Sequence, residues 1–355
     1  MPRRNSSLVQ FTASPTRTHM PIPSRPLVTV VICNYNYRQY LQDAIHSALT
    51  QTYQPLELIV VDDGSTDGSW ELLQSQPSCI RCLRIPHSGQ LAAYWAGIEA
   101  SRGSIICFLD SDDVYRPTKV ETIVSAFIRM PAAEWVCHTL EFTDANLMPF
   151  GLLAANFRQS GPSPNSPHHY LERLITLSTS GLAMRRTTAY TVFHRLRAQL
   201  QPLSNSVPFG GLQYHADACI AAVIAALNIK GYRVFECLTY YRRHGDRQRG
   251  EHDRIRSALE TERNVTKLVI QLYNAESGQH SQSSHFYKCC LVLDALNTGS
   301  SYTRRRTAFL MRGALIALRL AKHDVALALR QCTAILFSYL APHLWVKRLA
   351  RRGYV

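Results

Sequence analysis

The sequence lacks any hydrophobic run long enough to cross a membrane. No window approaches the roughly 18 uncharged apolar residues that a spanning helix needs. Residues 218–227, ACIAAVIAAL, are short enough to fit a buried helix. The N-terminus carries Arg3 and Arg4, but no apolar stretch follows them, so we expect no secretory signal. Both absences argue against a membrane-spanning or secreted protein.

Paired cysteine spacings are also scarce. The ten cysteines include a single C-x-x-C, Cys79 and Cys82, without the second pair that a zinc site needs. Most of the others stand in apolar runs, as Cys33 and Cys107 do, where a reduced thiol behaves as a small hydrophobic side chain. We therefore expect a reducing, cytoplasmic compartment and no structural zinc.

Acidic residues are almost missing from the end of the chain. Residues 301–355 contain eleven Lys and Arg side chains and one carboxylate, Asp324, which places ten of the fourteen net positive charges there. Charge alone suggests nucleic acid, but the segment has no interleaved aromatic residues and no reading motif. We therefore expect no nucleic-acid partner.

The basic residues of this segment recur with helical spacing. Arg305, Arg312 and Arg319 are seven residues apart, and each step returns near the same face of a helix. One explanation is an amphipathic segment that lies on an anionic membrane surface, at the inner face of the membrane. The other is a helical subdomain that packs on the rest of the protein with a solvated arginine face. Both stay open.

What the chain does contain is a regular alternation of β-branched runs with helical periodicity. Such an alternation predicts an α/β fold with a doubly wound, mostly parallel sheet. The expected strands are residues 28–33, 56–61, 79–85 and 104–109. The expected helices are residues 38–51, 65–73 and 91–100, and one that opens at Pro117.

The pattern is looser after about residue 126. We expect strands at 135–142 and 180–185, one or two strands within 232–247 that run into a basic loop, and helices at 187–200 and 214–229. Everything beyond Glu251 is expected to be helical.

Polar clusters follow three of the expected strands, where ligands collect in a doubly wound sheet. The clusters are Asn34-Tyr35-Asn36, Asp62-Asp63 and Asp110-Ser111-Asp112-Asp113. Carboxylates this close raise each other's pKa unless something neutralises them. The D-x-D spacing suits Mg²⁺, which takes one or two carboxylates together with phosphates and water. Asp113 is expected to cap the next helix. The alternative to a metal site is that all three carboxylates cap helices or end loops.

Four ordered segments between Pro26 and Phe127 resemble the inverting family 2 glycosyltransferases with the GT-A fold. The order, spacing and residue types of these segments match the family over about a hundred residues, which makes the signal far more specific than a lone D-x-D motif. The segments are VTVVICNYNY…YLQDAIHSALTQTY (28–53), ELIVVDDGSTDGS (57–69), HSGQLAAYWAGI (87–98) and GSIICFLDSDDVY (103–115). SGLAMRR, YHADACIAAVIAALNIKGYRV and CLTYYRRHGD are similar in the second half.

The resemblance implies a division of labour among the site residues. Those that would contact the nucleotide-sugar are Asn34, Tyr35, Asn36, Asp62, Asp63, Gly89, Asp110, Ser111 and Arg243. Asp112, together with His244, would hold Mg²⁺ or Mn²⁺ at the diphosphate, where a metal acts as a Lewis acid. Arg242, Arg243 and His244 would form a basic loop over the pyrophosphate, and a solvated surface loop remains the alternative.

The resemblance also implies a general base at the head of a helix in the second half, and Asp217 is the best match. A helix N-terminal cap is the rival explanation for Asp217. Two positions depart from the family pattern, since Trp95 stands where Asn is common and Ala216 where Glu often precedes the Asp. We expect Trp95 to pack in the core.

The implied organisation is a disordered basic arm (1–25), a nucleotide-sugar-binding half (26–127), an acceptor half (128–250) and a basic helical C-terminal region (251–355). The implied activity is metal-dependent, inverting transfer from a UDP- or GDP-linked sugar to a glycan or lipid-linked acceptor in polysaccharide or envelope synthesis. A non-catalytic nucleotide-sugar-binding scaffold is one alternative. A sugar nucleotidyltransferase would need a Gly-rich phosphate loop after the first strand, and CNYNYRQY has no glycine.

Overall fold

The computed structural model describes nearly all of the first half of the chain and the main helices of the second. The described residues are 23–154, 159–163, 177–200, 216–243, 251–278, 287, 290–291, 304–319 and 325–340. The strands are β1 (Val28–Asn34), β2 (Leu56–Asp62), β3 (Ile80–Arg84), β4 (Ile105–Asp110), β5 (Val114–Tyr115), β6 (Trp135–Thr143), β7 (Pro149–Ala154), β8 (Gly161–Pro162), β9 (Leu182–Arg185) and β10 (Gly231–Arg242). The helices are α1 (Arg38–Leu49), α2 (Ser69–Gln74), α3 (Gln90–Ala100), α4 (Lys119–Arg129), α6 (Arg186–Leu200), α7 (Ala216–Ala226), α8 (Glu251–Ser277), α10 (Arg304–Arg319) and α11 (Val325–Leu340).

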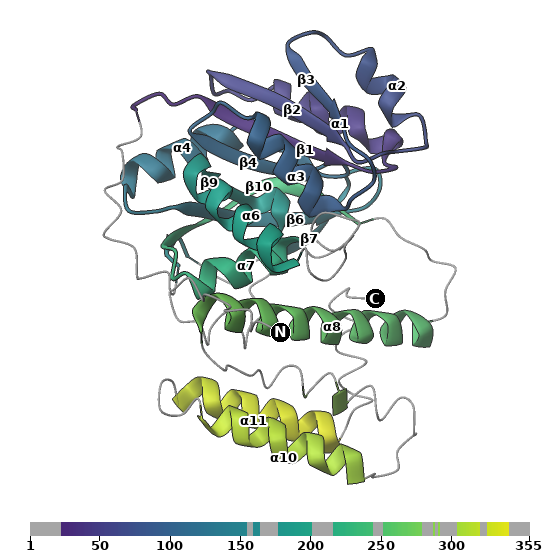
Figure 1. The fold of residues 1–355 in the computed structure, drawn as a ribbon, viewed down its shortest axis with the longest axis vertical. Helices are drawn as coiled ribbons and strands as arrows, with labels where there is room; N and C mark the ends of the chain where they lie inside the picture. The colour runs from purple at the N-terminus through teal and green to yellow at the C-terminus, as the bar shows by residue number, and fades with distance from the viewer. Residues whose placement is uncertain are drawn as a thin grey trace, which may run out of the picture.

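The strands form one sheet in the order β3-β2-β1-β4-β9-β6-β10-β5, with β7 beside β6 and β8 beside β10 (Figure 1). Strands β1 to β4 pair in parallel, and β10 is parallel to β6. Only the shorter strands β5, β7, β8 and β9 run the opposite way among the described residues. The expected α/β class with a mostly parallel sheet is therefore confirmed. Residues 26–127 and 128–250 contribute strands to the same sheet.

The central strands form where the sequence predicts because both of their faces are buried. Every residue of β1 is buried, and successive side chains point to opposite faces. Val31, Ile59 and Phe108 join the core under α3, α6 and α7. Val30 and Val60 join the core under α1 and α4. Burying a Val or Ile side chain contributes about 1.5–3 kcal/mol, so this two-sided burial is the main support of the sheet.

The predicted helix at 65–73 begins later than expected. Asp67 Oδ1 accepts the Ser69 backbone N–H at 3.0 Å, and the helix starts at Ser69 after Gly68, whose φ is +86°. Ser65 and Thr66 instead hydrogen-bond to the segment that follows β1. The helix start predicted from Ser65, Thr66 and Asp67 is therefore wrong by four residues. Ser65 and Thr66 bind residues at and just after the end of β1 and do not begin the helix.

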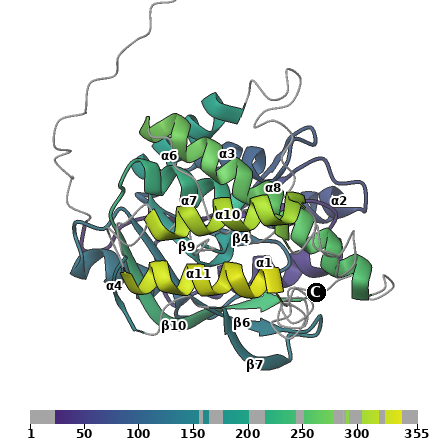
Figure 2. The same cartoon turned by 90° about the horizontal axis from the view of Figure 1, so that it is seen from below.

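The described C-terminal segments are helical, as expected. In Figure 1, α8 crosses below the sheet, and α10 and α11 lie at the lower end. Figure 2 shows α10 and α11 next to each other, and Leu291, Ala317 and Ile335 form a small buried cluster in this region. No helix in the described part of the chain combines the length and apolarity that crossing a bilayer takes.

Candidate functional site

The three polar clusters meet at one edge of the sheet, as expected from parallel strands. Asn34 pairs in register with Asp62, and Cys33 pairs with Asp110. Backbone hydrogen bonds extend both ladders past the strand ends, from the Asp63 N–H to the Asn34 carbonyl at 2.8 Å and from the Ser111 N–H to the Cys33 carbonyl at 3.1 Å. The convergence is confirmed.

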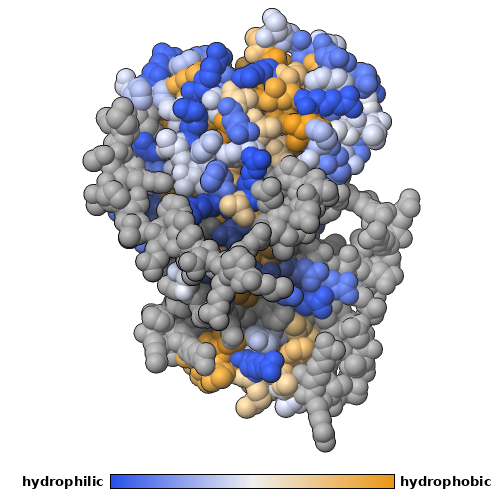
Figure 3. All heavy atoms as spheres, in the orientation of Figure 1, coloured by the Kyte–Doolittle hydropathy of each residue, from blue (hydrophilic) through white to orange (hydrophobic). Residues whose placement is uncertain are grey.

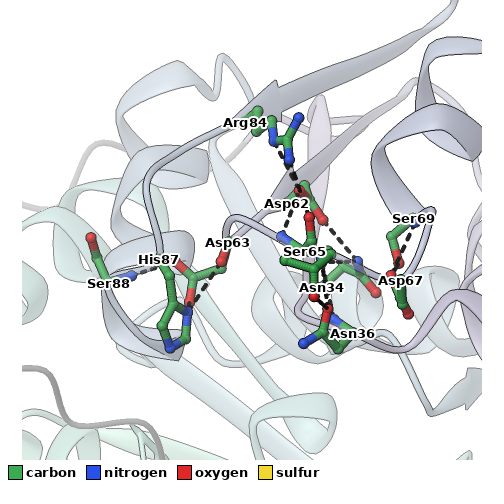
Figure 4. Close-up of polar contacts among 11 residues, drawn as sticks. Asn34, Asn36, Asp62, Asp63, Ser65, Asp67, Ser69, Arg84, His87 and Ser88 are labelled. Carbon is green, nitrogen blue, oxygen red and sulfur yellow. Dashed lines mark hydrogen bonds and ion pairs between the residues drawn. The ribbon is translucent and has the colours of Figure 1, made fainter.

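Asn34 and Asp62 are fully buried and bind each other (Figure 4). Asn34 Nδ2 donates to Asp62 Oδ1 at 3.0 Å and to Ser65 Oγ at 3.1 Å. Asp62 Oδ2 accepts the Ser65 N–H at 3.1 Å and lies 3.6 Å from Arg84 Nε. Both side chains therefore shape the turns that follow β1 and β2.

Asp63 is buried and organises the segment before α3. Its Oδ1 accepts the Ser88 N–H at 2.7 Å, and its Oδ2 accepts the Gly89 N–H at 2.9 Å. His87 Nδ1 lies 2.9 Å from the same Oδ2. Burial raises the pKa of Asp63, although these donors and the nearby imidazole pull it back. Gly89 has φ +91°, a backbone conformation that favours glycine, which explains the residue at this position.

Tyr35 is the exposed aromatic residue of the site, with 39% of its surface accessible. Its ring stacks on His87 with centroids 3.9 Å apart and planes 16° apart. Asn36 follows at φ +56°, which Asn tolerates better than most residues, and its Oδ1 accepts the Thr66 N–H at 2.8 Å. A flat, accessible aromatic platform therefore lies beside the buried carboxylates.

Asp110 is held by three side-chain donors. Gln90 Nε2 and Tyr94 Oη donate to its Oδ1 at 2.6 Å each, and Thr179 Oγ1 donates to its Oδ2 at 2.6 Å. Burial, and after it the charge of Asp112, raise the pKa of Asp110, and the three donors partly offset this. The orientation of this carboxylate is thus fixed from α3 on one side and from the turn before β9 on the other.

Asp113 does not cap a helix, contrary to the expectation. It is buried ahead of the short strand β5, and its Oδ1 accepts the Arg242 backbone N–H at 3.0 Å. Arg242 is likewise no loop residue, because it ends β10 in the interior. Its guanidinium donates to the Asp112 carbonyl, the Ala145 carbonyl and the Asp43 carboxylate. The 110–113 segment is therefore clamped from β10, and Arg242 is committed to that contact.

Asp217 lies in the first turn of α7, where its Oδ1 accepts the Ala218 N–H at 2.7 Å. A helix N-terminus stabilises an anion, as the capping explanation requires. Burial nevertheless raises the pKa of Asp217 to about 6, and the charge of Asp110 adds to the rise. The side chain is therefore ionised at neutral pH and more basic than an ordinary aspartate.

Tyr241 of β10 is subject to the negative charge of carboxylates from both halves of the sheet domain. Burial raises the pKa of its phenol well above the usual value, and the surrounding negative charges raise it further. The charges responsible are those of Asp113, Asp112, Asp110 and Asp217. Four carboxylates from β4, the loop after it and α7 thus share one electrostatic environment.

We expect Asp217→Asn to stabilise the folded protein at pH 8 in the presence of EDTA. The pKa of the folded state is about 6 against an ordinary 3.8, so ionisation costs folding free energy that is fully felt above pH 6 and vanishes below pH 3.8. Two pKa units correspond to a gain on the order of 1–3 kcal/mol. Urea unfolding should show this gain at pH 8 and a much smaller one at pH 4.5, and an equal gain at both pH values would contradict the assignment.

Asp112 is the half-buried carboxylate of the D-x-D pair, between Asp110 and the buried Asp113. The oxygen-rich donor set suits a hard cation. Burial, and after it the negative charge of Asp112, raises the pKa of Asp110 and of Asp113, and a cation would neutralise this charge. Among the described residues, no three His, Cys, Asp or Glu side chains gather to hold an ion unaided. An ion here would take further ligands from phosphates and water. His244 lies outside the described residues.

Arg243 and Ser111 lie at the edges of the site. The Arg243 N–H donates to the Thr143 carbonyl at 2.8 Å, and its guanidinium lies 5.5 Å from the centre of the Phe142 ring. Ser111 is buried, with its N–H on the Cys33 carbonyl.

Sequence reasoning missed Gln90, Tyr94, Thr179 and Tyr241. Gln90 and Tyr94 are four residues apart in the first turns of α3, a spacing that places both on one helix face beside Asp110. That spacing could have predicted that Gln90 and Tyr94 share a helix face. Nothing in the sequence around Thr179 or Tyr241 predicts that they approach Asp110, which is more than sixty positions away.

Trp95 packs in the core, as predicted, with 6% of its surface accessible. Its ring lies 5.0 Å from that of Tyr190 on α6. The departure from the family pattern at this position is therefore accommodated by packing between α3 and α6.

Two sequence comparisons agree on a family. The profile of the family described as Glycosyl transferase family 2 matches residues 29–193. An uncharacterized glycosyltransferase of Nostoc sp. is 34% identical over 229 residues, which are 61% of this chain and 65% of the relative. An Escherichia coli protein named UDP-Glc:alpha-D-GlcNAc-diphosphoundecaprenol beta-1,3-glucosyltransferase WfaP is 35% identical over 96 residues, 26% of this chain and 38% of that protein. The chain thus spans less than two thirds of either relative's length.

A solved structure shares the architecture. The crystal structure of S. aureus TarS 1-349 in complex with UDP-GlcNAc covers 92% of this chain and 92% of its own, with a TM-score of 0.50 and 14% sequence identity. At that identity the likeness shows a common fold alone.

Proposed function

We propose that the protein is a metal-dependent, inverting glycosyltransferase, because residues 29–193 match the profile of glycosyl transferase family 2 and the chain shares its fold with the TarS structure. It moves a sugar from a nucleoside diphosphate to an acceptor hydroxyl. The proposal is carried by the acidic residues Asp110 and Asp112 at the end of β4 and by Asp217 of α7, whose negative charges all act on the buried phenol of Tyr241. These carboxylates would supply both functions that the reaction needs, a cation site and a general base.

The donor would lie along the edge formed by the ends of β1, β2 and β4. Tyr35 offers its exposed ring to the base, and the Asp63-ordered segment 87–89 offers backbone groups beside it. Asp110, oriented by Gln90 and Tyr94, would face the ribose. The E. coli relative is named for a UDP-linked glucose, which favours a uridine donor over a guanosine donor here.

Asp112 would hold the divalent cation, Mg²⁺ or Mn²⁺, with the donor's phosphates as further ligands. The bound ion supplies Lewis-acid stabilisation of the charge on the departing diphosphate. Arg242 keeps the Asp112 backbone in place through the 2.9 Å bond to its carbonyl. Arg243, which directly follows Arg242 at the end of β10, would contribute positive charge to the diphosphate.

Asp217 would act as the general base. With a pKa of about 6 it is ionised at neutral pH and accepts the proton of the acceptor hydroxyl as that oxygen bonds to the anomeric carbon. The bond from that carbon to the diphosphate oxygen breaks on the opposite face, and the bonding electrons leave with the nucleotide. One displacement of this kind inverts the anomeric configuration.

The acceptor we propose is a glycan hydroxyl, on a growing or lipid-linked chain, in polysaccharide or cell-envelope synthesis. The E. coli relative is named for a diphosphoundecaprenol-linked acceptor, which supports this choice. We propose that the reaction takes place on the cytoplasmic side of the membrane, and the free thiols of the described cysteines support a reducing compartment.

A thermal-shift panel tests the proposal. Binding to the folded state raises the melting temperature according to affinity. We expect UDP and UDP-sugars to raise the melting temperature more with Mn²⁺ than with EDTA. In a separate activity assay, the protein should release UDP from a UDP-sugar when acceptor is present. A panel in which no nucleoside diphosphate shifts the melting temperature with either metal would contradict the proposal.

Tyr35→Ala should raise the KM for the donor about tenfold and leave kcat nearly unchanged. Stacking a base on an aromatic ring contributes about 1–3 kcal/mol, and the loss falls on binding because the ring is remote from the reacting bonds. Tyr35→Phe keeps the ring and serves as the matched control with an unchanged KM. Steady-state kinetics with UDP-sugar measure both, and equal KM values for wild type and Tyr35→Ala would remove Tyr35 from the donor site.

A further inference from the structure

Helices α10 and α11 expose an unusual amount of apolar surface. On α10 the exposed large residues are Met311, Leu315 and Leu318, with 54–66% of their surface accessible. On α11 they are Leu329, Leu336 and Leu340, with 49–64% accessible. Figure 3 shows apolar surface gathered beside hydrophilic surface at this end of the molecule. Single exposed leucines need no explanation, but six on two neighbouring helices do.

The exposed apolar residues form one stripe on each helix. On α10, residues 311, 315 and 318 have the spacing i, i+4 and i+7. On α11, residues 329, 336 and 340 have the spacing i, i+7 and i+11, which also keeps them on one face of the helix. The opposite faces are used for packing, through Ala317 on α10 and Ile335 on α11. Each helix therefore has a buried face and a second apolar face that no described residue covers.

Positive charge accompanies the stripe on α10. Arg312 is exposed next to Met311, about 100° around the helix from it, so that its head lies beside the stripe and outside the buried face. Residues 301–355 contain eleven basic residues and one acidic residue. A second copy of the chain would bring a second concentration of ten net positive charges against the first, and that repulsion disfavours self-association.

We propose that α10 and α11 form a docking surface for an anionic lipid bilayer, with the leucine stripes inserted at the level of the headgroups. Amphipathic helices with apolar and basic faces bind in this way, through apolar burial and attraction to anionic lipids. The surface does not depend on the proposed sugar transfer, although it would bring the enzyme to a lipid-linked acceptor. The helices lie on the membrane and do not cross it.

Vesicle flotation tests the surface with the full-length protein. The vesicles contain phosphatidylcholine alone or with 30% phosphatidylglycerol. Wild type should float with the anionic vesicles and stay largely free of the neutral ones, and 0.5 M salt should weaken binding because it screens the headgroup charge. Leu315→Gln combined with Leu318→Gln should lower the partition coefficient tenfold or more. Ile128→Gln on α4, where 45% of the residue's surface is exposed, is the control for loss of an exposed apolar side chain and should float as wild type does.

Three results would overturn the proposal. The double variant could float as wild type does, or wild type could bind both vesicle types equally or neither. A wild-type dimer that the double variant converts to a monomer, seen by light scattering, would instead assign the face to a second copy. Because the substituted leucines are exposed, the melting temperature should stay within a few degrees of wild type. The UDP-dependent thermal shift of the same samples reports the donor site separately, so failure of either proposal is recognisable.

Discussion

Asp217→Asn should lower sugar transfer by a factor of about 10²–10⁴ and leave UDP binding near wild type. Loss of a general base typically has an effect of that size. Asparagine keeps the shape and can still accept the Ala218 N–H, so the first turn of α7 stays intact. The loss should therefore appear in kcat, and the UDP-induced thermal shift should be preserved.

The matched control is Glu99→Gln, an exposed carboxylate on α3 whose removal changes the net charge by the same amount. It should transfer sugar at the wild-type rate. Wild-type turnover in Asp217→Asn would exclude this residue as the base. A loss of both transfer and UDP binding would assign it to the donor site instead.

Asp112→Asn should abolish the gain in UDP affinity that Mn²⁺ provides and lower transfer by about 100-fold or more. A Lewis acid at the leaving group contributes several kcal/mol to the transition state, and 1.4 kcal/mol is a factor of ten. The amide is a much weaker ligand for a hard cation than the carboxylate it replaces. Calorimetric titration with UDP, in Mn²⁺ and in EDTA, measures the difference directly.

Glu99→Gln serves again as the control for this substitution, because Glu99 is exposed near the end of α3, whereas Gln90 and Tyr94, which contact Asp110, lie in its first turns. Its UDP titrations should match those of wild type in both buffers. Should Asp112→Asn keep the full Mn²⁺ effect, the cation would have to bind elsewhere and the role given to the D-x-D pair would be wrong.

The first half of the fold could be predicted because its signals are local. Strands such as β1 and β4 are continuous apolar runs buried on both faces, and each is followed at once by polar residues. Parallel pairing then brings Asn34, Asp62 and Asp110 to one edge without any further information. The same logic located Asp217 at a helix start, with the family resemblance supplying its role.

The contacts that complete the site could not be predicted, because they join segments far apart in the chain. Arg242 reaches the 110–113 segment across about 130 residues, and its sequence neighbourhood, YYRRHGD, suggested a surface loop. Asp113 precedes the helix that follows Pro117, but the two-residue strand β5 lies between them. Asp113 is therefore buried against β10 and not at the start of the helix. Ser65 and Asp67 are residue types that often begin helices. Here the Ser65 hydroxyl instead accepts a hydrogen bond from Asn34 at the end of β1, and Asp67 accepts the Ser69 N–H within the turn.

Crystals grown with UDP and Mn²⁺ test the central claim most directly, through anomalous diffraction at a wavelength where manganese scatters strongly. A single strong peak is expected, bonded to an Asp112 oxygen and to the diphosphate, at the end of β4. A peak bound to other residues, or well-ordered UDP beside an Asp112 carboxylate without manganese, would contradict it.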